Sequence, residues 1–352
     1  MPAGPRTANA RTRPPAGVRR CFVRMAASAA LAAALLAGCG RSPGAPAARR
    51  VRLILDFLPN AVHAGFYQAE EAGYFRQEGL EVRIEPPTST SDTLRLMAAG
   101  QAEFGIVSLL DFLNARSKGE PLKIVMALEQ RPLGSVFCLS SSGIRRPRDL
   151  PGRLVSLTGV LSDEAGVRWM VRHDGADPSS VRTINIGFNA AQEVIAGNVD
   201  AAFGFWNQDA LQVGLRKPVT VLRLDAWGAP RYPELVLFAR EDFLARDPSA
   251  ARAFLRAACR GYQDAIDRPD GALTAMAARV EGETVEGLRP YLDAVRPVLR
   301  ADAPAYGRLD LGALRDYVAW IGETGVVGFH ADPASFATNE FLPPLPQAAP
   351  TR

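Results

Sequence analysis

The chain has 352 residues, of which 47% are hydrophobic and 22% are charged, and its formal net charge is +4. This composition is typical of a globular protein. Much of the positive excess comes from arginines in the first 24 residues, so the rest of the chain is close to neutral and gives no indication of nucleic-acid binding.

The N-terminal segment has the organisation of an export signal. Residues 1–24 are rich in Arg and Pro and contain no acidic residue, and an apolar run follows at residues 25–38. The run leads into the letters LAGC, which resemble a bacterial lipobox. We therefore expect a lipoprotein signal peptide at 1–39, with Cys39 as the lipidated residue. A plain signal peptide with an unrelated cysteine is the alternative, and the letters RRCFVR leave open whether export uses the Sec or the twin-arginine route.

Two short segments differ in composition from the body of the chain. Residues 40–49 are small and polar with prolines, which predicts a flexible tether, and residues 343–352 predict a disordered tail. Between them lie about 300 residues, enough for two domains. Whether Cys138 and Cys259 are free stays open, and the lack of a CxxC pattern or a histidine cluster argues against a structural metal site.

The body alternates between predicted strands and helices. The first series has strands at 51–57, 80–87, 102–109 and 122–128 and helices at 63–79, 88–101 and 110–120. The stretch 134–142 leads to residues 145–159, where a second series starts. The second series then has strands at 181–187, 199–206, 219–225 and 233–242 and helices at 161–175 and 189–198. From Asp247 onward the pattern is helical.

This alternation predicts an α/β fold with two lobes, each a parallel-type sheet flanked by helices. We expect lobe 1 to comprise residues 50–137 and 239–342, and lobe 2 to comprise residues 138–238. Extended strands near residues 136–140 and 235–239 would cross between the lobes as a hinge.

Polar turns follow several of the predicted strands. Ligands of such folds bind at the carboxyl ends of strands, against the starts of helices. The turns lie at 56–63, 86–92, 156–164, 187–192 and 205–209. We therefore expect the turns to converge on one binding cleft.

Four stretches between Val51 and Asp242 resemble a known family. They read DFLPNAVHAGFYQAEEAGYFRQEGLEV, LMAAGQAEFGIVS, NIGFNAAQEVIAGNVDAAFGFWNQDAL and YPELVLFARED. They are similar to substrate-binding proteins of ABC importers, specifically the thiamine-pyrimidine precursor (SsuA/THI5-like, NMT1-like) family. The resemblance implies a two-lobed periplasmic-binding-protein fold of type II. Phe57 stands where the family more usually has Trp, and Asp209 where it usually has Glu.

The first polar turn supplies four candidate ligand-binding residues. Asp56 ends a buried strand, where a carboxylate either caps the turn or meets a ligand amine. Asn60 is either the N-cap of the next helix or a ligand contact. His63, in the first turn of that helix, is a structural histidine or a ligand contact, and Tyr67 lies one turn further on the same face.

The end of the second series supplies further candidates. Trp206 either stacks on a flat heterocycle or packs between the lobes. Asn207 and Asp209 suit the donors and acceptors along the edge of an aminopyrimidine. Three weaker candidates head a helix or loop on the cleft side, where each is also a plausible cap: Ser108, Thr158 and Glu164.

The resemblance implies a solute-binding protein that captures a small planar heterocycle, with an aminopyrimidine precursor of thiamine favoured. A riboflavin-type heterocycle, an alkanesulfonate and nitrate are the alternatives. The implied partners are ABC permease and ATPase subunits, and the membrane through the lipid on Cys39, on the extracytoplasmic side. A related eukaryotic synthase uses a cofactor-linked lysine and a histidine where this chain has Val107 and Asp111. We therefore expect no enzyme activity and no cofactor, with a synthase-like enzyme as the competing class.

Overall fold

The computed structural model describes residues 48–89, 91–324 and 326–345. The predicted signal peptide with Cys39 lies outside the described residues, as do most of the predicted tether and tail. Strand β1 begins at Arg49, the last residue of the predicted tether. None of the helices within the described ranges is long and apolar enough to cross a membrane.

The first sheet has five strands in the order β2-β1-β3-β10-β4. Its strands are β1 (Arg49–Ile54), β2 (Leu80–Glu85), β3 (Phe104–Ser108), β4 (Leu122–Ala127) and β10 (Leu235–Arg240). Strand β1 pairs in parallel with β2 and β3, whereas β10 is antiparallel to both of its neighbours. Strand β10 follows the strands of the second sheet along the chain, and it is the strand that runs in the opposite direction in the first sheet.

The second sheet also has five strands, in the order β7-β6-β8-β5-β9. Its strands are β5 (Gly134–Leu139), β6 (Leu154–Leu157), β7 (Arg182–Asn185), β8 (Ala201–Phe205) and β9 (Val219–Arg223). Strand β6 is parallel to β7 and β8, and β5 is antiparallel to β8 and β9. The predicted α/β class is confirmed, but both sheets are mixed rather than parallel. A strand that enters from the other sheet needs no crossover helix within its own sheet, so it can run antiparallel.

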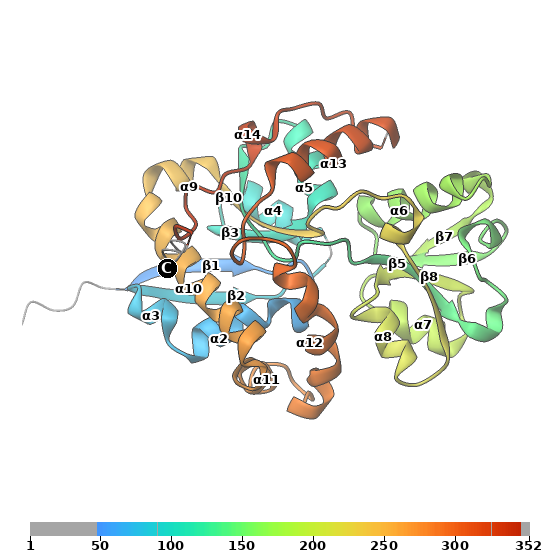
Figure 1. Cartoon of the computed structure of the whole chain (residues 1–352), viewed down its shortest axis with the longest axis horizontal. Coiled ribbons are helices and arrows are strands. Elements are labelled where there is room, and N and C mark those ends of the chain that lie inside the picture. Colours follow the sequence, from blue (N-terminus) through green and yellow to red (C-terminus); the bar gives the residue numbers. More distant parts are fainter. Residues whose placement is uncertain (1–47, 90, 325, 346–352) are drawn as a thin grey trace, which may run out of the picture. The chain divides into compact units, whose positions relative to one another are not determined.

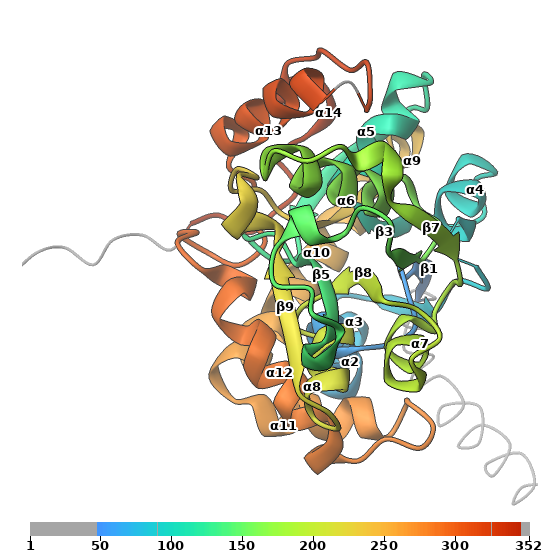
Figure 2. The ribbon, with the colours of Figure 1, turned by 90° about the vertical axis from the view of Figure 1, so that its right-hand side faces the viewer.

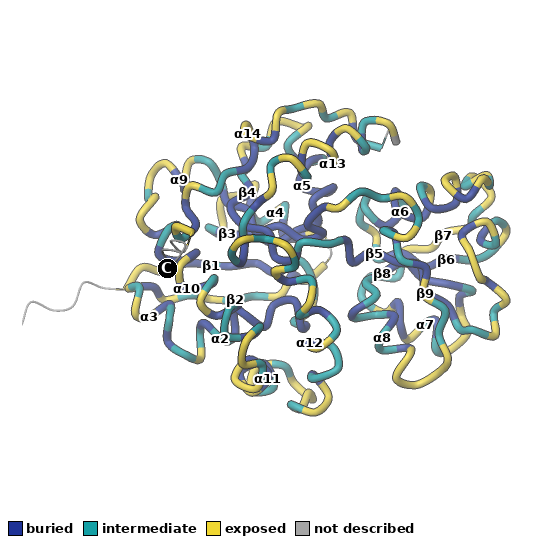
Figure 3. The backbone as a smooth tube through the Cα atoms, in the orientation of Figure 1, coloured by how far each residue is buried: buried dark blue, intermediate teal, exposed yellow. Residues whose placement is uncertain are grey.

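Helices cover both sheets (Figures 1 and 2). The first sheet carries α2 (Ala64–Glu71), α3 (Tyr74–Gln77), α4 (Asp92–Ala98), α5 (Leu109–Ser117), α9 (Glu241–Arg246), α10 (Pro248–Asp267), α11 (Pro269–Ala277), α12 (Val285–Arg300), α13 (Leu311–Thr324) and α14 (Pro333–Phe336). The second carries α6 (Leu161–His173), α7 (Ala190–Ala196) and α8 (Asp209–Gly214). Figure 3 shows the strands mostly buried and the outer sides of the helices exposed, as expected for sheets covered by helices.

Helices α2 and α10 approach each other closely through two glycines. A Cβ atom on Gly261 would lie 2.1 Å from the carbonyl oxygen of Gly65, and a Cβ on Gly65 would overlap the ring of Tyr262. The Tyr262 hydroxyl donates to the carbonyl of Val62 over 2.6 Å. This contact fixes the polar turn that follows β1 against the core, which matters for the site described below.

The chain passes from the first sheet to the second between β4 and β5, and returns between β9 and β10. The strands expected to cross near 136–140 and 235–239 are β5 and β10, and each belongs to one sheet only. The crossing segments lie just before these strands, at residues 128–133 and 224–234. The expected crossing strands are therefore wrong, and a hinge at the crossing segments stays a prediction. The predicted limits of the two lobes stay a prediction.

Two carboxylates tie the crossing segments together. Glu129, just after β4, accepts a hydrogen bond from the backbone N–H of Leu235 over 2.6 Å. In return, Glu234, just before β10, accepts from the N–H groups of Leu133 and Gly134 over 2.9 and 3.0 Å. Each crossing segment thus satisfies backbone donors of the other, which would otherwise be buried without partners.

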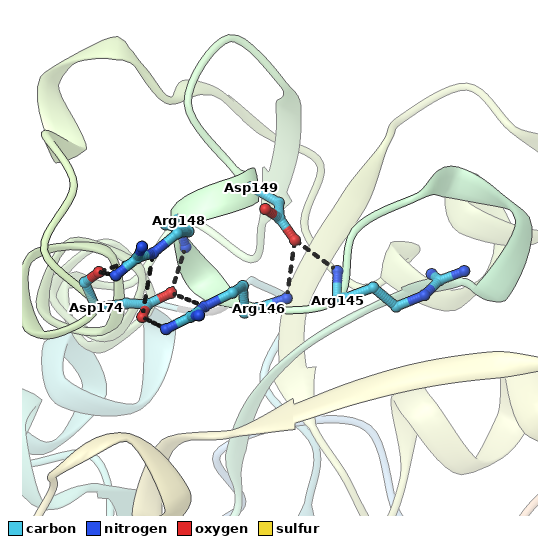
Figure 4. A network of polar contacts seen from close by, with 5 residues as sticks. All are labelled: Arg145, Arg146, Arg148, Asp149 and Asp174. Carbon is cyan, nitrogen blue, oxygen red and sulfur yellow. Dashed lines mark hydrogen bonds and ion pairs between the residues drawn. The ribbon is translucent and has the colours of Figure 1, made fainter.

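A polar network fixes the 3-10 helix η3 (Pro147–Asp149) to the end of α6 (Figure 4). The buried carboxylate of Asp174, directly after α6, accepts from the guanidinium of Arg146 and from the backbone N–H of Arg148. The hydrogen bonds from Arg146, together with the nearby charge of Arg148, lower the pKa of Asp174 to about 2. The network therefore holds α6 in place, and the first turn of α6 lies at the site described below.

Replacing Asp174 by Asn should destabilise the protein. The pKa of Asp174 is depressed, so its contribution is present above the ordinary pKa of 3.8 and is lost as the pH falls through about 2. We expect Asp174→Asn to lower the free energy of unfolding by about 1–2 kcal/mol at neutral pH. This value is kept small because Arg146 is partly exposed and solvent screens its ion pair with Asp174. Denaturant titration measures the change.

Asp270→Asn is the matched control for this substitution. Asp270 is 81% exposed and pairs with Arg289 at the surface, so its replacement should change stability by less than about 0.5 kcal/mol. Equal effects of the two substitutions at neutral pH would contradict the structural role of Asp174.

Candidate functional site

A cavity lies where the parallel strands of the two sheets end. It is lined by residues at or just beyond the carboxyl ends of β1, β3, β6 and β8, for example Asp56, Ser108, Thr158 and Phe205. The space between its walls is about 780 Å³, a figure that includes open solvent. The position is the one expected for ligands of open α/β sheets.

The lining of the cavity is acidic. Five carboxylates line it: Asp56, Asp111, Asp163, Asp209 and Glu234. Among the residues that the structure describes, no arginine, lysine or histidine lines this cavity. The site is therefore suited to a ligand that offers hydrogen-bond donors or positive charge.

His63 holds Asp56 at the cavity. Nε2 of the fully buried His63 ring lies 2.8 Å from Oδ1 of Asp56. The backbone N–H of Asn60 donates to Nδ1 of the same ring over 3.2 Å, so we assign the proton of the neutral imidazole to Nε2. His63 thus donates to Asp56 and orients it. The Asn60 side chain acts as the N-cap of η1 (Ala61–His63) and accepts from the N–H of Val62.

Asp111 joins the two halves of the cavity. It lies in the first turn of α5, beside the first sheet, and accepts from the hydroxyl of Ser162 over 2.8 Å and from the N–H of Leu161 over 3.2 Å. Both donors belong to the start of α6, beside the second sheet. Ser108 also donates to Asp111 and accepts from its N–H. Burial raises the pKa of Asp111, although these donors oppose the shift.

Asp163 and Asp209 close two turns of the second sheet. Oδ2 of Asp163 accepts from the N–H and the hydroxyl of Thr158 over 2.7 and 2.6 Å. Oδ2 of Asp209 accepts from the N–H of Phe205 over 2.9 Å. A Cβ atom on Gly204 would lie 2.7 Å from this oxygen, so the carboxylate needs glycine there. Burial raises the pKa of Asp163 to about 7 and that of Asp209 to about 6.

Glu234 serves both the hinge and the cavity. Its Oε2 accepts from the two amides of the first crossing segment, and the Tyr232 hydroxyl donates to the same oxygen over 3.2 Å. Burial raises its pKa. Because Glu234 also lines the cavity, one carboxyl group contacts both a crossing segment and the cavity.

Aromatic rings and aliphatic side chains supply the apolar part of the lining. Phe57 comes from the turn after β1, and Phe203 and Phe205 come from β8. The ring of Phe57 packs edge-on against Phe188, with ring centroids 4.4 Å apart. Rings from both sheets therefore flank a cavity with polar edges, an arrangement that suits a flat ligand with polar substituents.

The predicted ligand-binding residues divide into two groups. Lining the cavity are Asp56, Asn60, Ser108, Thr158 and Asp209, and outside its lining are His63, Tyr67, Glu164, Trp206 and Asn207. Within the first group, Ser108 and Thr158 also act as caps through Asp111 and Asp163. Within the second group, His63 reaches the cavity only through Asp56.

Tyr67, Glu164 and Trp206 have other contacts. Tyr67 is only 5% exposed in the core, and burial raises its pKa to about 12. Glu164 pairs with Arg168 at 2.8 Å on the partly exposed side of α6. Nε1 of Trp206 donates to the carbonyl of Pro132 over 3.1 Å, and the Arg223 guanidinium lies 4.3 Å from its ring centroid. Trp206 thus fastens the second sheet to a crossing segment rather than facing this cavity.

Two amide side chains beside Asp209 lack partners. Asn207 is fully buried, and neither atom of its amide has a hydrogen-bond partner among the described residues. Oε1 of Gln208, which lines the cavity, is also buried without a partner in this part of the chain. Buried polar atoms in folded proteins are nearly always paired, so these amides mark a place where a further polar group would be favourable.

Sequence reasoning missed several lining residues, namely Asp111, Asp163, Gln208 and Glu234. A local signal existed for the first two. Ser108 and Asp111 have the spacing of a helix cap, and Asp163 directly precedes the Glu164 that was chosen. One helical step turns a side chain by about 100°, which separates a cavity residue from an exposed one. Glu234 follows no polar turn, and only the packing of the crossing segments reveals it.

The described residues contain neither a metal-binding cluster nor a disulfide. No group of three or more His, Cys, Asp and Glu side chains in these ranges is arranged to hold a metal ion. Cys138 and Cys259, whose pairing was left open, are not joined by a disulfide. Val107 lines the cavity at the position that the synthase resemblance singled out, and it is apolar.

Most of the chain is similar to known proteins. A model of the NMT1/THI5-like family matches residues 60–272. The chain is 32% identical over 250 residues to a formylaminopyrimidine-binding protein of Halalkalibacterium halodurans, covering 70% of this chain and 76% of that protein. It is 25% identical over 309 residues to a 4-amino-5-hydroxymethyl-2-methylpyrimidine phosphate synthase of Legionella pneumophila, covering 84% and 93%.

Solved structures share the fold at low identity. The alkanesulfonate-binding protein SsuA of Xanthomonas axonopodis pv. citri, bound to MOPS, superposes with a TM-score of 0.66 and 13% identity, covering 83% of this chain and 98% of that one. The periplasmic nitrate-binding protein NrtA of Synechocystis superposes with a TM-score of 0.63 and 13% identity, covering 85% and 88%. These likenesses confirm the predicted periplasmic-binding-protein fold.

Asp163→Asn should make the protein more stable at high pH. The pKa of Asp163 is raised to about 7, so the favourable contribution of its protonated form is present below 3.8 and is lost as the pH rises through about 7. Asn keeps an acceptor for Thr158 without a charge. We expect a gain in the free energy of unfolding of roughly 2–4 kcal/mol above pH 7 that vanishes near pH 4.

Denaturant unfolding at several pH values measures this difference. Asp200→Asn is the control, because the carboxyl of Asp200 is partly exposed in the same half of the molecule and accepts from the N–H of Leu154. If Asp163→Asn is less stable than the unsubstituted protein at every pH, the bonds from Thr158 outweigh the cost of burial and the predicted sign is wrong.

Proposed function

The chain belongs to the NMT1/THI5-like family, and we propose that it is the extracytoplasmic solute-binding protein of an ABC importer. Its ligand would be a small planar amino-substituted heterocycle, with an aminopyrimidine precursor of thiamine favoured. The name of the relative with 32% identity, a formylaminopyrimidine-binding protein, supports this ligand class.

The observation that carries the proposal is the acidic cavity at the strand ends. An exocyclic amine offers hydrogen-bond donors along one edge of a flat ring, and a ring nitrogen adds a donor and positive charge when it is protonated. The carboxylates of Asp56 and Asp209 accept such groups. The ring faces would lie against Phe57 and Phe205. The unpartnered Oε1 of Gln208 and the buried amide of Asn207 offer further polar groups nearby.

Capture would couple to closure of the two lobes. The cavity takes its lining from both sheets, so a ligand that touches both sides binds the closed arrangement better than an open one. Permease and ATPase subunits would then recognise the occupied, closed form. A lipid on Cys39 would keep the protein at the extracytoplasmic face of the membrane.

The structural neighbours that bind alkanesulfonate and nitrate suggest a competing, anionic ligand. An anion requires arginine, lysine or free N–H groups. Within the described residues the cavity instead collects five carboxylates and no cationic side chain. Bringing an anion next to these groups would cost free energy through like-charge repulsion, which disfavours both alternatives.

The enzymatic alternative comes from the synthases among the relatives. A covalent mechanism through a Schiff base requires a lysine amine at the site. Among the lining residues that the structure describes there is no lysine, and the apolar Val107 stands at the position singled out by the resemblance. These features support a binding protein over a synthase.

Titration calorimetry tests the proposed ligand. The purified full-length chain should bind formylaminopyrimidine or 4-amino-5-hydroxymethyl-2-methylpyrimidine and should not bind ethanesulfonate or nitrate. Phe57→Ala removes a ring from the lining and should weaken aminopyrimidine binding by roughly tenfold or more. Leu58→Ala is the control, because Leu58 is 45% exposed and lies outside the lining.

The result that would overturn the ligand class is specific. Binding of ethanesulfonate or nitrate without binding of either aminopyrimidine contradicts the proposal. If the purified protein instead forms a pyrimidine product when it is supplied with pyridoxal phosphate, the cofactor that would form the Schiff base, the result would favour the synthase hypothesis.

A second experiment tests attachment to the membrane. Cys39 follows an apolar run in the letters LAGC, so cells that express the full chain should incorporate labelled palmitate into it. Cys39→Ser should abolish the label, whereas Cys21→Ser, four residues before the apolar run, should not. An unlabelled wild-type chain would contradict lipid anchoring.

A further inference from the structure

The five carboxylates of the cavity differ in how many protein donors they already have. Asp111 accepts from Ser108, Ser162 and the N–H of Leu161. Glu234 accepts from two backbone amides and Tyr232, and Asp163 accepts from both donors of Thr158. These three groups are structural, because their oxygens close turns or join segments of the fold.

Within the described residues, Asp56 and Asp209 accept the fewest hydrogen bonds from other residues among the five carboxylates, one each. The described contacts of Asp56 use only Oδ1, which accepts from His63. Those of Asp209 to its neighbours use Oδ2, which accepts from the N–H of Phe205. One residue follows β1 of the first sheet and the other follows β8 of the second. A ligand in the cavity therefore has one under-used carboxylate on each side.

A neutral ligand does not balance the negative charge of the carboxylates that line the cavity. Bringing several carboxylates around one partly enclosed space raises the free energy of their ionised forms. Consistent with this, burial and then the nearby Asp111 and Asp209 raise the pKa of Asp163 to about 7. A neutral amino-heterocycle would bring the donors of its amine, but it would displace water from these groups without supplying a positive charge.

We infer that the cavity binds its ligand as a cation, with the positive charge shared between Asp56 and Asp209 from opposite sheets. This inference rests on the proposed function and narrows it: the favoured form is a protonated amino-heterocycle in which the ring N–H and the exocyclic amine donate to the two carboxylates. A phosphorylated or sulfonated form of the same heterocycle is rejected, because it would bring negative charge beside the remaining carboxylates.

Two small probes of matched size test the charge requirement by calorimetry on the full-length chain near neutral pH. 4-Aminopyridine carries a proton on its ring nitrogen under these conditions, whereas aniline is a flat ring of the same size without charge. We expect 4-aminopyridine to bind at least roughly tenfold more tightly than aniline, the scale of a close, partly desolvated charge pair.

Isosteric substitutions locate the charge pair. Asp56→Asn keeps an acceptor for His63, and Asp209→Asn keeps one for the N–H of Phe205, so each removes charge with little change of shape. We expect each to remove most of the preference for 4-aminopyridine while aniline binding changes less than about threefold. Asp270→Asn removes an exposed carboxylate elsewhere and should leave the preference unchanged.

The outcomes separate this inference from the proposed function. If 4-amino-5-hydroxymethyl-2-methylpyrimidine binds while 4-aminopyridine and aniline bind equally well, the ligand is bound as a neutral molecule and the inference fails, but the proposed function stands. The inference also fails if the preference survives unchanged in both Asp56→Asn and Asp209→Asn. If none of the heterocycles binds and ethanesulfonate does, the proposed function itself is wrong.

Discussion

The reciprocal hydrogen bonds between the two crossing segments are the constraint on which the site depends. Glu129 accepts from the N–H of Leu235, and Glu234 accepts from the N–H groups of Leu133 and Gly134. Both carboxyls are buried, and burial raises both pKa values, that of Glu129 well above its usual range. Such groups are costly to bury, yet here they satisfy backbone donors where the chain leaves one sheet for the other. They fix how the strand ends of the two sheets face each other, and so they define the cavity.

Hydrogen bonds from backbone amides to carboxylates also recur around the cavity. Acidic side chains accept hydrogen bonds from backbone amides at the starts of helices or the ends of strands, as Asp111 does for α6 and Asp209 does for the N–H of Phe205. These bonds place negative charge at fixed positions, with no cationic side chain among the described residues that line the cavity. A preorganised acidic lining costs folding stability, and a ligand that supplies donors or positive charge recovers part of that cost. Stability and ligand preference thus follow from one feature, the burial of carboxyl groups at strand ends.

The sequence predicted more of the fold than of the site. Alternating strands and helices predicted the α/β class with two sheets, because hydrophobic periodicity is local. The directions of β5 and β10 were missed, since they depend on which sheet each strand joins.

Asp56 and Asp209 were chosen as carboxylates at strand ends, and both line the cavity. Trp206 was expected either to stack on a ligand or to pack between the lobes, and Tyr67 was a candidate ligand contact. Long aromatic side chains serve a core as readily as a ligand, and only their contacts with neighbouring segments distinguish the two roles. Glu234 lies in no polar turn and becomes a site residue only through tertiary packing.

Native mass spectrometry of the protein, purified gently from the cells that produce it, tests the central claim most directly. The acidic cavity between the two sheets should retain a small nitrogen heterocycle that bears an amine, released on denaturation in amounts that approach one per chain. A protein with Asp209→Asn should retain much less of it. Retention of a sulfonate, a phosphate ester or another anion in its place would contradict the assignment of this cavity to a basic ligand.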